Sequence, residues 1–352
     1  MVFSLTIILS DHAKANTTPP NSMLNVPDSL LPEGNYTSLH AVTFLELLDA
    51  ENNFKQAGNA KKTMLKLLRI AGMKNSFRNN TLGSRIFLDL ANISIRLKMY
   101  PLAMKWYGQS TRLNRKKIIP SYNDSQYIPD TTNNSQLIQT DSIEKIHFST
   151  SPAPESLPVH IQDIRCSFQD GKKAVSFAII VHVKQPVHGR RKAFSGINNV
   201  GHTFITLIKM NYDNSSVSRS FGFYPAKKHF LSATPLHPGD GPIIKDDALH
   251  PWDETVGKFI TEKKFNRILE NLEKFSSTRY NLNKNNCTDF GLSEAMIAGI
   301  NIKETVGHWP LGKGNNPANA GQSLLERKFE NKDQEYPETL VVNEGQDLFD
   351  SN

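Results

Sequence analysis

The spacing of apolar residues changes from a helical to a strand-like period partway along the chain. In the first third, apolar side chains recur every three to four positions, which places them on one face of a helix. Ile86, Leu90, Ile93 and Leu97 show this spacing. The pattern predicts four helices, at about 39–57, 60–71, 83–100 and from Pro101 onward, where proline opens a helix.

From residue 157 the apolar period becomes two, which is typical of strands. Polar or turn-forming clusters separate the strands that this pattern predicts, at 159–166, 175–183, 202–210 and 217–224. Residues 225–257 read as a long irregular insertion, and an insertion of that length is usually functional. An amphipathic helix is predicted after Thr261, and further helices are predicted from Cys287 to about Gly299 and over 318–327. We therefore expect an α+β fold, with an all-α helical-hairpin domain followed by an antiparallel sheet with packed helices.

Polar, proline-containing segments divide the chain into expected domains. Linkers are predicted at 16–37 and 116–156, where Asn, Ser, Thr and Pro are frequent. They would separate a helical domain at 38–115 from a catalytic domain at 157–330. An acidic tail, 331–352, completes the chain.

The paired helices are similar to tetratricopeptide-type hairpins, chiefly in the segment from Leu97 to Tyr107. Two hairpins are fewer than the three repeats that such arrays need, so a plain four-helix domain remains the alternative. Either arrangement offers a surface for a protein partner.

The distribution of charge along the chain indicates which partners to expect. The net charge is +7, divided between a tail of −5 and a body of +12, which favours an anionic partner such as a cell-wall polymer. Basic runs with interleaved aromatic residues are absent from the sequence, so nucleic acid is not an expected partner.

Residues 1–15 contain a short apolar core and a small-x-small site, which indicates a signal peptide and export to the periplasm or beyond. A frayed strand is the alternative. No run of about 20 apolar residues predicts a transmembrane segment.

Only two cysteines occur, and one lies where reactive thiols are found. Cys287 begins a predicted helix, where unpaired N–H groups and the helix dipole favour a thiolate. His202 opens a predicted strand and supplies a matching base. The pair indicates a Cys/His enzyme. A disulfide with Cys166, or two merely structural residues, are the alternatives.

The residues around this pair resemble a known family. Gly201-His202-Thr203-Phe204, a following strand that ends Phe221-Gly222-Phe223-Tyr224, and Asn285-Asn286-Cys287-Thr288 before a helix are similar to the circularly permuted papain-like group. This group includes lecithin retinol acyltransferase-like proteins and relatives of NlpC-type peptidases. The resemblance covers about residues 160–300. It implies a permuted papain-like domain in which Cys287 is the nucleophile and His202 the base.

The sequence also suggests residues that would stabilise an oxyanion and one that would orient the histidine. Asn286 is expected to cap the helix, and with Thr288 it marks the helix start at which an oxyanion would be stabilised. No histidine-orienting residue matches the family, and Tyr224 is the candidate third polar residue. No metal site or cofactor is predicted. The long insertion reads as a solvated polar loop, with a metal site as the alternative, and it holds His229, His237, Asp240, Asp246, Asp247 and His250.

The leading functional prediction is a cysteine hydrolase, a peptidase or amidase acting first on cell-wall peptides. A lipid-directed acyltransferase or thioesterase is the alternative enzyme. The alternative from another class is a non-catalytic interaction protein, favoured by the incomplete set of catalytic residues.

Overall fold

The computed structural model describes residues 81–118, 155–195, 199–226, 233–309 and 311–343, which belong to one compact unit. The first two predicted helices, the candidate signal peptide and the linker at 16–37 lie outside these ranges. The helices are α3 (Thr81–Arg96), α4 (Tyr100–Ile118), α7 (Ile161–Phe168), α8 (Glu262–Ser277), α9 (Cys287–Ala298) and α10 (Pro317–Leu325). The strands are β1 (Ala174–Lys184), β2 (His202–Asn211), β3 (Ser216–Pro225), β4 (Gly239–Asp240), β5 (Pro242–Asp246), β6 (Glu254–Ile260), β7 (Tyr280–Asn281), β8 (Ile300–Ile302), β9 (Val306–Trp309), β10 (Gly312–Asn315), β11 (Phe329–Asn331) and β12 (Leu340–Asn343).

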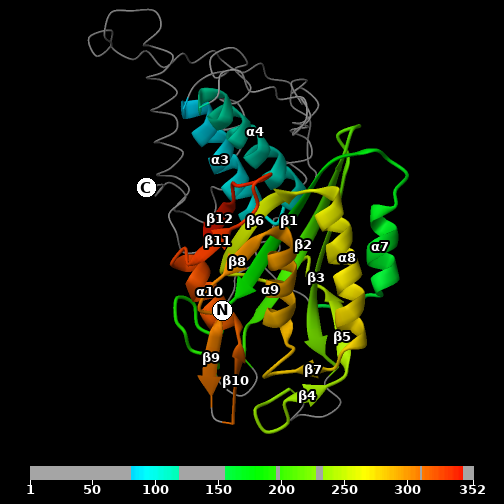
Figure 1. Cartoon of the computed structure of the whole chain (residues 1–352), viewed down its shortest axis with the longest axis vertical. Helices are drawn as coiled ribbons and strands as arrows, with labels where there is room; N and C mark the ends of the chain where they lie inside the picture. The colour runs from blue at the N-terminus through cyan, green and yellow to red at the C-terminus, as the bar shows by residue number, and fades with distance from the viewer. Residues whose placement is uncertain (1–80, 119–154, 196–198, 227–232, 310, 344–352) are drawn as a thin grey trace, which may run out of the picture. The chain divides into compact units, whose positions relative to one another are not determined.

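One antiparallel sheet organises this part of the chain. Its six strands run in the order β12-β6-β1-β2-β3-β5 (Figure 1). Each neighbouring pair is antiparallel. Every residue of β2 is buried, so both faces of the sheet centre are covered. The predicted α+β class, with helices packed on an antiparallel sheet, is confirmed at this level.

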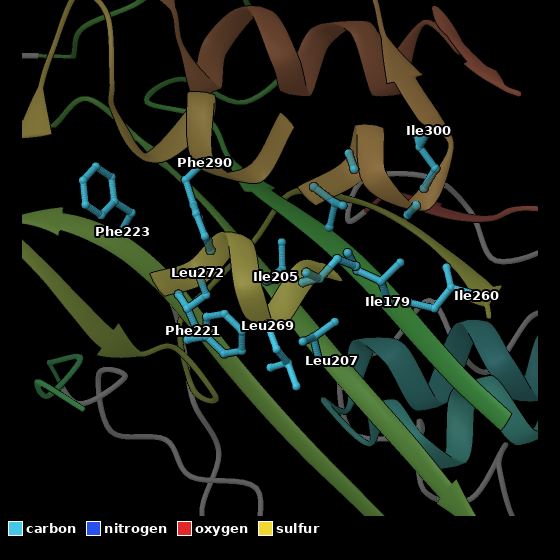
Figure 2. Packing of buried hydrophobic residues seen from close by; sticks show 14 of the residues in the cluster. Ile179, Ile205, Leu207, Phe221, Phe223, Ile260, Leu269, Leu272, Phe290 and Ile300 are labelled. Atoms are coloured by element: carbon cyan, nitrogen blue, oxygen red, sulfur yellow. The ribbon is translucent and has the colours of Figure 1, made fainter. Parts of the chain in front are cut away.

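Helices α8 and α9 cover one face and form the core with it. Thr261 caps α8 by accepting a hydrogen bond from the Lys264 N–H, as the sequence predicted. Figure 2 shows side chains of α8 and α9, such as Leu272 and Phe290, directed at the sheet residues Ile205 and Phe221. Burial of each such side chain contributes about 1.5–3 kcal/mol. This layer fixes the start of α9 against β2.

Helices α3 and α4 pack against each other and against the opposite face of the sheet. Phe87 and Trp106 stack between the two helices with ring centroids 5.6 Å apart. Tyr100 lies 4.8 Å from the His182 ring of β1, and Tyr107 lies 6.2 Å from the Phe259 ring of β6. The described part of the predicted helical domain at 38–115 thus shares one compact unit with the sheet.

Two predicted segments differ from the structure. The segment 159–166 was predicted as a strand with Cys166 half-buried in it, but it lies largely in the helix α7, and Cys166 is exposed. Ile161, Ile164 and Phe168 follow a helical spacing that also satisfies a short alternation. The insertion 225–257 is not irregular throughout, because it contains β5 and the start of β6.

The predicted acidic tail, 331–352, also contributes to the sheet. Its residues Leu340 and Val342 are buried in β12, which pairs with β6. Asp333 forms an ion pair with Lys258, which is fully buried in β6. The boundary predicted at residue 330 therefore falls inside the folded unit.

Candidate active site

The first turn of α9 holds Cys287 in a fixed position. The Asn286 side chain caps the helix by accepting hydrogen bonds from the N–H groups of Thr288 at 2.7 Å and Asp289 at 3.2 Å. Asp289 completes a capping box by accepting from the Asn286 N–H at 2.9 Å. The helix ends as predicted at Gly299, in the left-handed conformation that favours glycine. Cys287 is therefore the first helical residue, where the dipole favours a negative charge.

The structure brings His202 and Cys287 together. The Cys287 side chain is hydrogen-bonded to His202, to the Thr203 N–H and to the Thr288 side chain. Burial alone raises the pKa of this thiol, but the hydrogen bond and positive charge of His202 outweigh it and lower the pKa below its ordinary value. The Cys287 residue is only 5% exposed.

Asp247, for which the sequence predicted no catalytic role, engages the other side of the histidine. The His202 Nε2 lies 3.0 Å from the Asp247 Oδ2. Because Nε2 is engaged by the carboxylate, Nδ1 is the ring nitrogen available to the thiol. Burial lowers the pKa of His202, but Asp247 and then Cys287 reverse the direction and raise it to about 9. The imidazole is thus held as a cation between two negative groups.

The backbone after β5 fixes Asp247. Its N–H donates to the Ser220 carbonyl at 3.0 Å. Its Oδ1 accepts from the hydroxyls of Tyr224 at 2.5 Å and Ser156 at 2.6 Å, leaving Oδ2 for His202. Burial raises the pKa of Asp247, yet these donors and the histidine lower it overall. The carboxylate is fully buried and saturated with donors.

Two glycines make these contacts sterically accessible. A Cβ at Gly222 of β3 would lie 2.4 Å from both the Asp247 Oδ2 and the His202 Nε2. A Cβ at Gly291 would lie 2.4 Å from the Thr203 Cγ2, so glycine lets α9 approach β2 closely.

Tyr224 does not contact the histidine through its hydroxyl, as a third catalytic residue would. Its ring packs on the His202 ring with centroids 4.2 Å apart, while the hydroxyl donates to Asp247. Burial and the negative charge of Asp247 raise the pKa of Tyr224. Asp247, and not Tyr224, therefore contacts the histidine as the third residue, and Tyr224 supports Asp247 through a hydrogen bond.

The predicted oxyanion residues are engaged in the cap. Both hydrogen bonds of the Asn286 Nδ2 go to backbone carbonyls, of Leu282 and Asn315, each at 2.8 Å. The Thr288 N–H is taken by the Asn286 side chain. What remains at the helix start is the Cys287 N–H, which donates to the Tyr280 hydroxyl. Burial and the charge of Cys287 raise the pKa of Tyr280, which stays a neutral phenol beside the sulfur.

The two cysteines remain separate. Cys166 and Cys287 are both free, and Cys166 is exposed whereas Cys287 is buried. Among the described residues no group of three or more His, Cys, Asp or Glu side chains is arranged to hold a metal ion.

Asp247 was missed because its strand was not recognised. Pro242-Ile243-Ile244-Lys245-Asp246 is a short run bounded by glycine and proline, in a segment that reads as a solvated loop. The available signal was the apolar pair Ile243 and Ile244, directly before two aspartates. A strand there places the residue after it at the end of the sheet.

Comparisons with family models, curated proteins and solved structures found no match to this chain. In the described ranges, no helix is both long enough and apolar enough to cross a membrane.

Proposed function

We propose that this protein is a cysteine hydrolase that cleaves an amide or ester bond, with Cys287 as nucleophile, His202 as base and Asp247 as the carboxylate that orients the base. The observation that carries the proposal is the His202 imidazole, held between the Asp247 carboxylate and the Cys287 thiol. A structural histidine and cysteine would need neither the buried carboxylate nor a thiol at a helix start.

The reaction follows from these groups. In the resting ion pair His202 already holds the thiol proton on Nδ1, and the Cys287 thiolate attacks the substrate carbonyl carbon. The oxyanion that forms is stabilised by the Cys287 N–H and by the Tyr280 hydroxyl, which turns to donate once a substrate oxygen replaces it as the acceptor. His202 then gives its proton to the leaving amine or alcohol. Water, deprotonated by His202, cleaves the thioester and releases the acid and the free thiol.

A peptide amide, first of all in a cell-wall peptide, is the substrate class that we propose. The order of His202 before Cys287, and the Asn-Cys pair at a helix start, support it through the resemblance to permuted papain-like peptidases. The +12 body supports an anionic polymer as the carrier of that peptide. Asp247 weakens the argument for a non-catalytic protein, which rested on a missing third residue.

The test is the pH dependence of Cys287 alkylation by iodoacetamide, followed by mass spectrometry of the peptides. In the native protein we expect the thiol pKa of Cys287 to lie well below the ordinary cysteine value of about 8.5. His202→Ala removes the positive charge and should raise that pKa strongly. Asp247→Asn should raise it less, because the histidine remains. Exposed Cys166 reports reagent activity in every sample.

A thiol with an ordinary pKa that neither substitution changes would overturn the proposal. Retained folding of each variant, checked by circular dichroism, makes that outcome interpretable.

A further inference from the structure

The loop 247–252, which we call the carboxylate loop, surrounds the base on one side. It carries Asp247, and it also carries His250, whose ring centroid lies 4.9 Å from that of His202. The His250 Nδ1 donates to the Pro251 carbonyl at 2.8 Å, and burial lowers the pKa of His250 to about 4. His250 is therefore a neutral ring that covers the base without competing for the carboxylate.

The start of α4 contacts this loop directly. The Lys98 ammonium, in the turn between α3 and α4, donates to the Leu249 carbonyl. The Tyr100 hydroxyl lies beside the Trp252 side chain at the end of the carboxylate loop. Tyr100 is only 3% exposed, so its ring is a packed part of this contact.

A column of rings also joins α4 to the base. Tyr100 lies 4.8 Å from His182, His182 stacks on Phe204 at 4.6 Å, and Phe204 stacks on His202 at 5.7 Å. The His182 and Phe204 planes differ by 15°, and the Phe204 and His202 planes by 11°. Rings in this order fix the plane of the His202 imidazole from the side of α4.

A hydrogen-bonded chain runs parallel to the rings and reaches the aspartate. The His182 Nε2 lies 2.9 Å from the Thr206 Oγ1, which lies 2.7 Å from the Ser220 Oγ. The Ser220 carbonyl accepts from the Asp247 N–H. His182 is therefore connected both to the base and to the backbone of its carboxylate.

We propose that the start of α4 is part of the catalytic scaffold, with Tyr100 and Lys98 as positioning residues that hold His202 and the carboxylate loop in register. The inference rests on the proposed function, and it gives the helical hairpin a role beyond a partner surface. Neither residue touches the reacting atoms. Both act through His182, Phe204 and the loop.

Several titratable groups face His202 and must be considered in any test. Asp247 and His250 come from the carboxylate loop, Tyr224 from β3 and Cys287 from α9. Tyr280 of β7 faces the thiol. Lys98 adds a positive charge near His182 and His250.

The main experiment compares two tyrosines of the same helix in the full chain. Tyr100→Leu removes the phenol beside Trp252 and the contact with His182, whereas Tyr107→Leu removes an equally buried tyrosine that packs on Phe259, away from the base. The readout is the pH profile of Cys287 alkylation. We expect Tyr100→Leu to slow alkylation at pH 6 by about threefold to tenfold, because one pKa unit changes the thiolate population tenfold. Tyr107→Leu should leave the profile unchanged.

A second pair avoids changes in the core. Lys98→Met removes the bond to Leu249, and Lys105→Met removes a similar bond from α4 to the Asn214 carbonyl, in the turn between β2 and β3. Only Lys98→Met should shift the profile. This inference would be overturned if the alkylation profiles were equal within both pairs of variants while the thiolate pKa of the native protein still depended on His202. That result would leave the proposed function standing. A native thiolate independent of His202 would overturn the proposed function itself.

Discussion

At Gly222, the absence of a side chain leaves the space in which His202 and Asp247 meet. The glycine lies where the β3 pairing with β2 ends, opposite Phe204, and it also pairs with Lys245 of β5, so nothing in the local strand pattern requires it. Its requirement comes from the two side chains that cross over it. A glycine inside a strand is often such a sign of close approach.

We expect Gly222→Ala to separate the imidazole from the carboxylate, because the new methyl group would overlap both atoms. The thiolate pKa of Cys287 should rise toward that of the Asp247→Asn variant, measured by alkylation. Gly241→Ala is the matched control, since its nearest neighbour would be an ordinary 3.6 Å away. An unchanged profile in Gly222→Ala would contradict the geometry given for the pair.

His182 predicts how stability depends on pH. Burial lowers its pKa to about 3, and the smaller effect of Asp247 does not offset this. Below the ordinary value of about 6.5 the unfolded chain binds a proton that the folded protein does not. The contribution of His182 to the free energy of unfolding should therefore be fully present above that pH, and fall by about 1.4 kcal/mol per unit as the pH drops toward 3.

Urea denaturation at a series of pH values tests this. His182→Asn can keep a hydrogen bond to Thr206 but cannot be protonated, so the slope between pH 6 and 4 should be smaller by about 1.4 kcal/mol per unit. The two proteins are compared by the slope of the free energy of unfolding against pH, because the loss of packing in the variant lowers that free energy equally at every pH. His250, whose pKa is also lowered, leaves a residual slope in the variant. Equal slopes would show that His182 is charged in the folded protein.

At the scale of elements, α9 carries both a structural cap and the proposed nucleophile. Asn286 has a counterpart in Asn316, which caps α10 by accepting from the Asn319 N–H. Replacing either cap by alanine should lower stability by about 1 kcal/mol. Only Asn286→Ala should also raise the thiolate pKa of Cys287, since only that cap fixes the helix start at the thiol.

Thermal denaturation and the alkylation profile, measured side by side, check this expectation. If both variants left the profile unchanged, the cap would hold the helix without setting the reactivity of Cys287.

Elements with strong local signals were predictable, and those defined by distant partners were not. The Thr261 cap and the periodicity of α8, and the Asn286 cap and terminal Gly299 of α9, determine these helices from within, as does the long alternation of β2. In contrast, β6 is buried along its whole length and contains Glu254 and Lys258 in place of an alternating pattern. Lys258 is accommodated through Asp333, far along the chain, which no local pattern shows. For the same reason Asp247 was not predicted, whereas His202 and Cys287 had motifs of their own.

At the scale of the whole molecule, the far end of the chain completes the sheet. Strand β12 covers the edge of β6 and buries Leu340 and Val342 there. The Arg96 guanidinium also donates to the Asn343 carbonyl at 2.6 Å, which joins the last strand to α3. The residues called a tail from their charge therefore stabilise the sheet.

We expect a chain shortened after Thr339 to lose several kcal/mol of stability through the buried side chains of β12. A chain shortened after Asn343 retains every described contact and is the control. Denaturant unfolding of the two proteins measures the difference. Equal midpoints would mean that β12 contributes little to the sheet.

The hydrogen bond from Ser156 to Asp247 decides which part of the chain an activity assay must include. The Ser156 hydroxyl reaches Asp247, so residues upstream of α7 help to hold the acid of the proposed site. An investigator who excises the part with alternating hydrophobicity, from Leu157 onward, discards this donor together with α3 and α4. Such a fragment would retain the thiol and the imidazole, but the Asp247 Oδ1 would keep only the Tyr224 hydroxyl of its two donors. Inactivity of the fragment would then reflect the cut, and only the intact polypeptide can decide whether the protein is an enzyme.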